Sequence, residues 1–309
     1  MMTTLIELRT KMRQLISKRE AWVNGLLRFV LALVCLLMVN WVLGYQQLLN
    51  HWWVAASVAL VCALIQMQGV TVIIIFYCLL HLMTLSTDVA LAALAIIVIS
   101  YAVCGYFQSK DTYNIITIPL CYQLNIPFMM PIGAGLSGGI YELPSVLFGS
   151  VVSYFLHIVS LNASTFLEAD SEMTASTLIQ TKLLTSPMFY IYIAAMCIVF
   201  ILVYYIRTSK IKHAWLVAVI SGVTIGFIIM LATHLFIEGR EGIPTLIIGS
   251  VVTLALGAVM TFFVQGIDYS RTEKVIYEDD DYIYYVTAVP KVHVAEQEKE
   301  VKKITEGKE

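Results

Sequence analysis

Charged side chains are scarce in this sequence of 309 residues. Asp, Glu, Lys and Arg make up only 13% of it, whereas water-soluble domains usually contain about 25%. Hydrophobic residues make up 59%, and the mean hydropathy is +0.82. This composition excludes a water-soluble enzyme, a nucleic-acid-binding protein with a basic surface and a disordered regulator. The sequence therefore predicts a protein that lies in a lipid bilayer and has no nucleic-acid partner.

Paired cysteines and the common catalytic motifs are also missing. The sequence has no C-x-x-C, no Walker loop and no H-E-x-x-H motif. Its six cysteines all fall in apolar segments, at positions 35, 62, 78, 104, 121 and 197. Such spacing argues against a zinc site and against a disulfide framework. We therefore expect no metal, no cofactor and no enzymatic activity.

One short motif is typical of an enzyme. Gly135-Leu-Ser137-Gly138 resembles the G-x-S-G motif of rhomboid-type intramembrane serine proteases, which pair this serine with a histidine on a later helix. His234 is the available histidine, but large residues follow it where that family has small ones. The resemblance covers four residues, and the sequence still favours a non-enzymatic protein.

Eight apolar segments approach the ~20 residues that a membrane-spanning helix needs. They are residues 25–44, 52–67, 70–85, 88–107, 139–161, 187–206, 215–237 and 244–267. The second and third are short and are separated only by Gln68 and Gly69, which predicts a tight helical hairpin in a locally thin or protein-buried place. We therefore predict an all-α polytopic membrane protein with about eight transmembrane helices, whose transmembrane domain covers residues 25–267.

Residues 114–138 are apolar on average but contain three prolines and three glycines. These residues interrupt a helix repeatedly. Irregular backbone at membrane depth is tolerated only where protein buries it or where it lines a wet cavity. We therefore predict a re-entrant or broken segment here, and the sequence leaves open whether the segment crosses the membrane.

Basic residues in short loops mark the cytoplasmic side of a membrane protein. Residues 1–24 contain five basic and two acidic side chains, and residues 207–212 contain three basic ones. Eight spans place both segments and the tail, residues 268–309, in the cytoplasm, and residues 162–186 outside. Apolar residues at helical spacing in 1–24 predict an amphipathic helix on the membrane surface.

A ten-residue pattern recurs at a spacing of one hundred residues. Pro144-Ser-Val-Leu-Phe-Gly149-Ser150-Val-Val-Ser153 matches Pro244-Thr-Leu-Ile-Ile-Gly249-Ser250-Val-Val-Thr253. Proline is tolerated in the first turn of a helix, and small residues allow another helix to approach closely. In the predicted topology the copies run in opposite directions, as inverted repeats of secondary transporters do. Chance similarity between apolar helices is the alternative.

Polar side chains inside the apolar segments are candidates for function. His81, His157 and His234 fall near the outer ends of three predicted helices. They predict either a vestibule that responds to protons or accepts a metal, or ordinary interfacial histidines. Five uncharged polar residues lie in or beside the broken segment, namely Asn114, Gln123, Asn125, Ser137 and Tyr141. They either contact a small ligand or satisfy interrupted backbone.

The tail predicts two β segments around the acidic run at residues 278–281. Within it, Asp268-Tyr-Ser-Arg-Thr-Glu-Lys-Val275 and Tyr284-Tyr-Val-Thr-Ala-Val-Pro-Lys291 resemble the C-terminal signature of a bacterial family of polytopic membrane proteins, loosely labelled ABC-transporter permeases. The resemblance covers residues 268–291 and the general hydrophobic layout. It implies residence in a bacterial plasma membrane and no established activity.

Two functional hypotheses follow. The first is a transporter-like or channel-like protein that moves a small solute between the two repeat helices and the broken segment. Its candidate path residues are Asn125, Ser137, Pro144, Gly149, Ser150, Pro244, Gly249 and Ser250. The second is a non-catalytic scaffold or assembly subunit that recruits a cytoplasmic partner, or another copy of itself, through its N-terminal helix and its tail.

Overall fold

The computed structural model describes residues 19–107, 113–168, 180–209, 213–238, 242–264, 273–278 and 283–288. The chain divides into two units, Met1–Phe263 and Val264–Glu309, and each is described by itself. The predicted amphipathic helix falls mainly on residues 1–18, which lie outside the described residues. Residues 169–179 of the predicted external loop at 162–186 also lie outside them.

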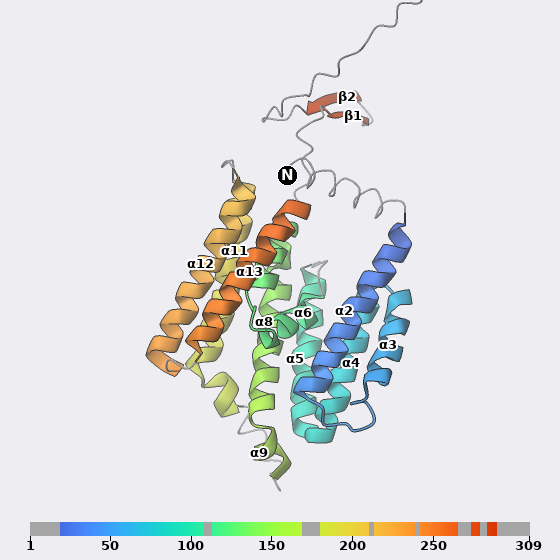
Figure 1. Cartoon of the computed structure of the whole chain (residues 1–309), viewed down its shortest axis with the longest axis vertical. Helices are drawn as coiled ribbons and strands as arrows, with labels where there is room; N and C mark the ends of the chain where they lie inside the picture. The colour runs from blue at the N-terminus through green and yellow to red at the C-terminus, as the bar shows by residue number, and fades with distance from the viewer. Residues whose placement is uncertain are drawn as a thin grey trace, which may run out of the picture. The chain divides into compact units, whose positions relative to one another are not determined.

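The regular secondary structure in the described part of the chain before the tail is entirely helical (Figure 1). They are α2 (Glu20–Val42), α3 (Trp52–Leu64), α4 (Met67–Leu85), α5 (Thr87–Tyr106), α6 (Asn114–Gln123), α7 (Met129–Ser137), η1 (Ile140–Glu142), α8 (Leu143–Leu161), α9 (Ala163–Glu168), η2 (Gln180–Leu184), α11 (Pro187–Thr208), α12 (Ala214–Thr233), η3 (His234–Glu238) and α13 (Ile243–Val264). Among the described helices, seven are long and apolar enough to cross a membrane: α2, α4, α5, α8 with η1, α11, α12 and α13. The protein is a helical multi-pass membrane protein.

The second of the eight predicted spans differs from the prediction. Its helix, α3, has 13 residues, so it is about 20 Å long and shorter than the other spans. The turn into α4 falls on Ile65 and Gln66, whose backbones are both extended. The prediction that Gln68 and Gly69 form this turn was wrong, since both residues lie in the first turn of α4. Apolar composition continues through the turn and so gave no signal for its position.

The long helices run between two ends of the bundle (Figure 1). We name the end where α2 begins and α11 ends the Arg207 end, and the opposite end the Trp53 end. Trp22 and Trp41, near the two ends of α2, are 82% and 77% exposed. Their separation of 19 positions corresponds to about 28 Å along a helix, which is close to the ~30 Å thickness of the hydrocarbon core. Tryptophan is enriched at both membrane interfaces, so the bilayer core lies between these two levels.

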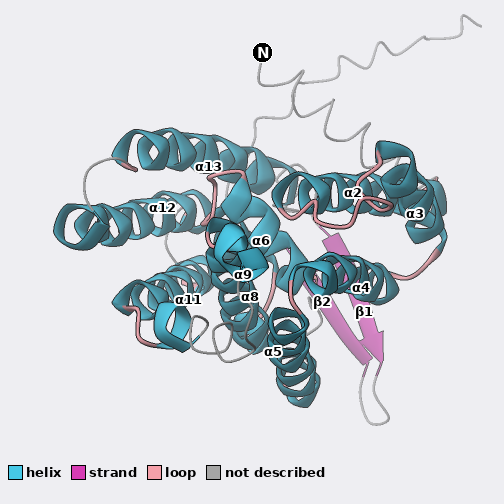
Figure 2. Ribbon diagram, turned by 90° about the horizontal axis from the view of Figure 1, so that it is seen from below, coloured by secondary structure: helices cyan, strands magenta, loops and turns pink. Residues whose placement is uncertain are grey.

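Buried apolar side chains form two clusters. The smaller cluster joins α2, α3 and α4, and reaches α6 through Ile116. The larger cluster joins α4, α5, α7, α8, α11 and α12. Figure 2 shows α2, α3 and α4 on one side of the bundle and α11, α12 and α13 on the other, with α6 and α8 between them. Both clusters include residues of α4 and of α6, so the two helix groups meet along these two helices.

Residues 114–137 form two short helices joined by a turn, which we name the α6–α7 hairpin. The segment is interrupted once, at residues 124–128, whereas Pro131, Gly133 and Gly135 lie inside α7. Pro119 lies within α6, and Pro127 lies in the turn. Asn125 in the turn has a φ of 60°, a left-handed conformation that asparagine adopts more easily than most residues.

Both ends of the α6–α7 hairpin lie at the Arg207 end of the bundle. At its start, the Asn114 Nδ2 donates to the Ser145 Oγ, at the third residue of α8, over 2.9 Å. At its close, Arg207 binds the last carbonyls of α7. The turn lies deeper, because the Phe128 ring packs where a Cβ on Gly226, in the middle of α12, would be. The segment therefore enters and leaves on one side of the bundle.

The second unit contains two strands, β1 (Glu273–Glu278) and β2 (Ile283–Ala288). They pair antiparallel, with a register that runs from Glu273 opposite Ala288 to Glu278 opposite Ile283. The acidic residues at 279–281 lie outside the described residues.

Candidate functional site

The two repeat glycines contact the α6–α7 hairpin at two different points. A Cβ on Gly149 of α8 would lie 2.6 Å from the carbonyl oxygen of Asn114, and a Cβ on Gly249 of α13 would overlap the carbonyl oxygen of Asn125. Glycine therefore allows both helices to pack directly against the backbone of the hairpin. The α8 copy contacts the start of the hairpin and the α13 copy contacts its turn.

The prolines and serines of the two repeat copies have local roles within their own helices. Pro144 and Pro244 are each the second residue of a helix, where the missing N–H removes no hydrogen bond. The Ser150 Oγ donates to the Val146 carbonyl over 2.7 Å, and the Ser250 Oγ donates to the Leu246 carbonyl over 2.8 Å. These matching bonds give the two helices the same local structure, and a role in a solute path stays a prediction.

Arg207, near the end of α11, caps the C-terminus of α7. Its Nη1 donates to the Leu136 carbonyl over 2.6 Å, and its Nη2 donates to the Gly138 carbonyl over 2.9 Å. The guanidinium also lies 5.6 Å from the ring centroid of Tyr204 and 5.8 Å from that of Trp215. A cation is stabilising at a helix C-terminus. Arg207 therefore fixes the second helix of the hairpin to α11.

A buried polar cluster lies where the hairpin meets α8. Asn114 is 0% exposed and Glu142 is 1% exposed. The Ser145 Oγ donates to the Glu142 carbonyl over 2.8 Å and accepts from the Asn114 Nδ2. The Asn114 Oδ1 accepts no hydrogen bond from any residue that the structure describes. The cluster ties the start of α6 to the first turn of α8.

Sequence reasoning missed Glu142 and Arg207 as site residues. Glu142 had no predicted role, and Arg207 was used only as one of the basic residues at 207–212 that mark orientation. Glu142 follows the predicted break closely, where interrupted backbone needs partners, and that position was the signal that could have identified it. Arg207 follows Leu136 by 71 residues, so no local pattern marks its contact with the hairpin.

The turn of the hairpin carries an exposed polar side chain deep in the bundle. The Asn125 carbonyl contacts Gly249, which lies six residues after the start of α13, or about 9 Å from that end of the helix. The side chain of Asn125 is nevertheless exposed. Ser137 is exposed as well, but at the Arg207 end, where its Oγ donates to the Gly133 carbonyl over 2.8 Å.

The three candidate histidines have different surroundings. His81 is fully buried in α4. His157 of α8 packs edge-on against Tyr122, with ring centroids 5.0 Å apart, and His234 packs against Gly242. Among the described residues, no group of three or more His, Cys, Asp or Glu could hold a metal ion. His234 follows α12 at the Trp53 end, so it lies far from Ser137, its partner in the protease motif.

His81 belongs to a hydrogen-bonded network with Asn40 and Tyr77. The Gln46 N–H donates to the His81 Nδ1 over 3.2 Å, which makes the Nε2 the donor to the Asn40 Oδ1 over 3.1 Å. The Tyr77 hydroxyl lies 2.9 Å from the same Oδ1, and the Asn40 Nδ2 donates to the Leu49 carbonyl over 3.0 Å. The network fixes the 43–51 connection to α2 and α4.

We expect the Asn40→Ala substitution to destabilise the protein, because it removes a shared partner from buried groups. The expected cost is about 1–3 kcal/mol for each group left unpaired. Asn50→Ala is the matched control, because Asn50 is exposed in the same connection and should change stability by less than ~0.5 kcal/mol. Thermal unfolding in detergent measures both. Equal midpoints for the two variants would contradict a structural role of the network.

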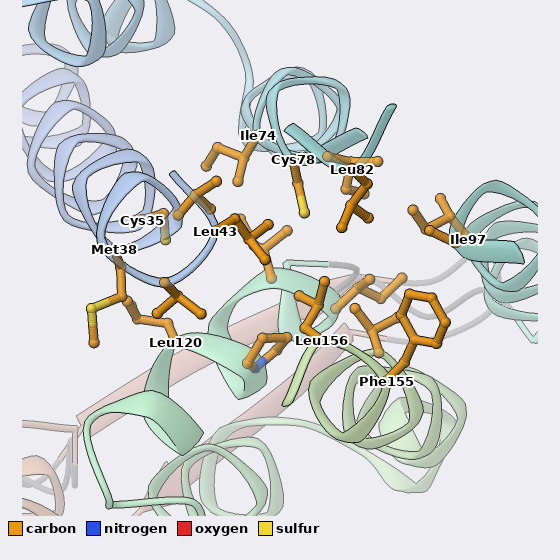
Figure 3. A pocket seen from close by; sticks show the side chains of 18 of the residues that line it. Cys35, Met38, Leu43, Ile74, Cys78, Leu82, Ile97, Leu120, Phe155 and Leu156 are labelled. Carbon is orange, nitrogen blue, oxygen red and sulfur yellow. The ribbon is translucent and has the colours of Figure 1, made fainter. Parts of the chain in front are cut away.

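An apolar cavity of about 80 Å³ lies between the α2–α4 group and the central helices α6 and α8 (Figure 3). Its walls come from α2, α4, α5, α6 and α8. An empty cavity of this volume would lower stability by about 2 kcal/mol. Gln123, at the end of α6, is the polar residue in a lining that otherwise consists of apolar side chains and cysteine thiols.

Comparisons with protein-family models, with curated proteins and with solved structures found no match for this chain. The fold and the site themselves define its class. It is a helical multi-pass membrane protein with an internal two-helix hairpin that is held by α8, α11 and α13.

Proposed function

We propose that this protein is transporter-like or channel-like and that a small solute crosses the membrane along the α6–α7 hairpin, between α8 and α13. In this proposal the protein lies in a bacterial plasma membrane with both termini, and therefore the Arg207 end, in the cytoplasm. The observation that carries the proposal is the exposed side chain of Asn125 in the turn of the hairpin.

The position of Asn125 implies water inside the apolar part of the bundle. Its contact with Gly249 and the contact of Phe128 with Gly226 both lie about 10 Å inside the Trp53 end. An amide that faces lipid at this depth would lose its hydrogen bonds to water. Non-helical backbone at this depth also requires protein or water around it. A water-filled cavity at Asn125 satisfies both requirements.

The two repeat helices support the same proposal. α8 begins at the Arg207 end, whereas α13 ends there (Figure 1), and each contacts the hairpin through the glycine of its copy. Helices that share a motif, run in opposite directions and flank a broken segment are typical of inverted-repeat transporters. The hairpin is the element whose movement would open or close the path.

Water access to Asn125 is the test. Asn125→Cys is made on a background in which the six cysteines are replaced by alanine, and the protein is placed in nanodiscs. We expect a charged, water-soluble thiol reagent to modify this cysteine. Ile248→Cys is the matched control, because Ile248 is 65% exposed and lies next to Gly249 at the same depth. It faces lipid and should stay unmodified.

Both cysteines should react equally with the charged reagent after denaturation, which controls for intrinsic reactivity. If Asn125→Cys is as unreactive as Ile248→Cys in nanodiscs, there is no water at the turn and the proposed path is wrong.

One observation favours the alternative scaffold function. Tyr285 and Val286 of β2 are 76% and 46% exposed, and an isolated two-stranded hairpin is marginally stable in water. A partner that covers β2 would stabilise it. In that case deletion of residues 270–309 should abolish capture of a cytoplasmic partner and leave the labelling of Asn125→Cys unchanged.

A further inference from the structure

The apolar cavity lies between the α2–α4 group and the central helices α6 and α8. Cys35 of α2 and Leu43, which follows α2, line it on one side, together with Ile74 and Leu82 of α4, and Phe155 of α8 lies opposite (Figure 3). α5 and α6 complete the lining. The cavity is therefore surrounded by five helices and lies within the apolar part of the bundle.

The lining extends along the helix axes on α4 and α6. On α4 it runs from Ile74 to Leu82 and on α6 from Ile115 to Gln123, which corresponds to about 12 Å along each helix. Apolar cavities stay dry and take apolar guests. A cavity with such a lining can therefore take a stretch of an extended hydrocarbon chain.

We infer that this cavity binds a hydrocarbon chain of a membrane lipid. Lipid chains are the apolar molecules that the bilayer supplies at the depth of the cavity, and the lining offers them apolar contacts along its length. The hydrocarbon chain would lie against Ile115 and Leu120 of α6 and would fill the cavity beside the hairpin. This inference does not depend on the proposed transport function, since a scaffold would bind the same chain.

Photo-crosslinking in nanodiscs tests the inference. The probe is a phosphatidylglycerol with a diazirine midway along one acyl chain. We expect adducts on Ile115 and Cys35, which are 1% and 3% exposed and so are out of reach of lipid on the outer surface. Adducts on Ile248 of α13, which is 65% exposed, provide the internal reference for surface lipid.

A matched pair of substitutions on α5 separates the cavity from the surface. Ala93 lines the cavity, so Ala93→Leu should fill it and reduce the adducts on Ile115 and Cys35 by about tenfold or more. Ala95 is exposed on the same helix, so Ala95→Leu should leave these adducts unchanged. The reference adducts on Ile248 should persist in both variants, which shows that the probe still reaches the outer surface, and equal thermal unfolding midpoints in detergent show that both variants are folded.

Two results would overturn the inference. The first is labelling of the wild-type protein only at exposed positions such as Ile248, which shows that no lipid chain enters the cavity. This result does not depend on the folding of the variants. Displacement of the probe from Ile115 by a free fatty acid, but not by excess unlabelled phosphatidylglycerol, shows that the ligand is a free apolar molecule rather than a membrane lipid. Neither result bears on the reaction of Asn125→Cys with the thiol reagent, so the lipid site and the proposed path are tested separately.

Discussion

Replacement of Gly249 with alanine is expected to destabilise the protein by about 1–3 kcal/mol, the range observed when an extra methyl group is forced into a packed site. The added Cβ would overlap the carbonyl oxygen of Asn125, which belongs to the backbone and cannot rotate away. Either α13 or the turn of the hairpin must move. Gly149→Ala should have a similar effect at the other contact, because its Cβ would meet the Asn114 carbonyl at 2.6 Å.

Gly105→Ala is the matched control for both substitutions. Gly105 also lies in a helix, but nothing lies within 4 Å of the position of its Cβ. Alanine has a higher helix propensity than glycine by up to ~1 kcal/mol, so this variant should be slightly more stable than the wild type. Thermal unfolding followed by tryptophan fluorescence in one detergent compares the three variants. A Gly249→Ala midpoint equal to that of Gly105→Ala would show that α13 does not pack on the hairpin.

The Arg207→Met substitution is expected to release the second helix of the hairpin. It removes the donors to the Leu136 and Gly138 carbonyls, and each carbonyl that is left unpaired costs about 1–3 kcal/mol. Leu136 is 0% exposed in the folded protein. A cysteine at position 136, on the cysteine-free background, should therefore be protected in the parent protein and should be modified much faster when Arg207 is replaced by methionine.

Arg207→Lys provides the conservative control. Lysine keeps the charge near the end of α7 but does not reproduce the two-pronged geometry of the guanidinium. We expect intermediate labelling of the cysteine at position 136. Protection that is the same in all three proteins would mean that Arg207 does not hold α7 in place.

The sequence was sufficient for most of the helical layout. Apolar runs of about 20 residues identify spans because a bilayer has a fixed thickness, and seven of the eight predicted spans correspond to long apolar helices. The exception is α3, where the apolar run continues through the turn at Ile65 and Gln66. Composition does not mark a turn that consists of apolar and uncharged residues.

The α6–α7 hairpin was predictable as an interruption but not as a shape. Pro127 lies where the continuous helix fails, but Pro119 and the glycines of α7 lie inside helices, so the composition indicated a break without fixing its position. The direction of the chain after the break depends on contacts such as that of Asn114 with Ser145. Such contacts join residues that are distant in the sequence, and a single sequence does not encode them in any local pattern.

The repeat pointed to Gly149 and Gly249 but not to what they touch. A small residue in a helix indicates close approach of another element, and the pattern favoured another helix lining a solute path. The structure places hairpin backbone against both glycines. Glu142 and Arg207 were missed because a charge at the end of a span is usually explained by the membrane interface.

Two short helices that end at the Arg207 end, α3 and α7, have their last carbonyls bound by arginines that are synthesised at different times. Arg28 of α2 donates to the Ile65 carbonyl at the end of α3 and precedes it by 37 residues. Arg207 follows Leu136 by 71 residues. During synthesis, α3 therefore meets its arginine as soon as it inserts, whereas α7 must wait until α11 has left the ribosome. The hairpin is thus completed late in biogenesis. A chain truncated before α11 would lack the hydrogen bonds from Arg207 to the Leu136 and Gly138 carbonyls.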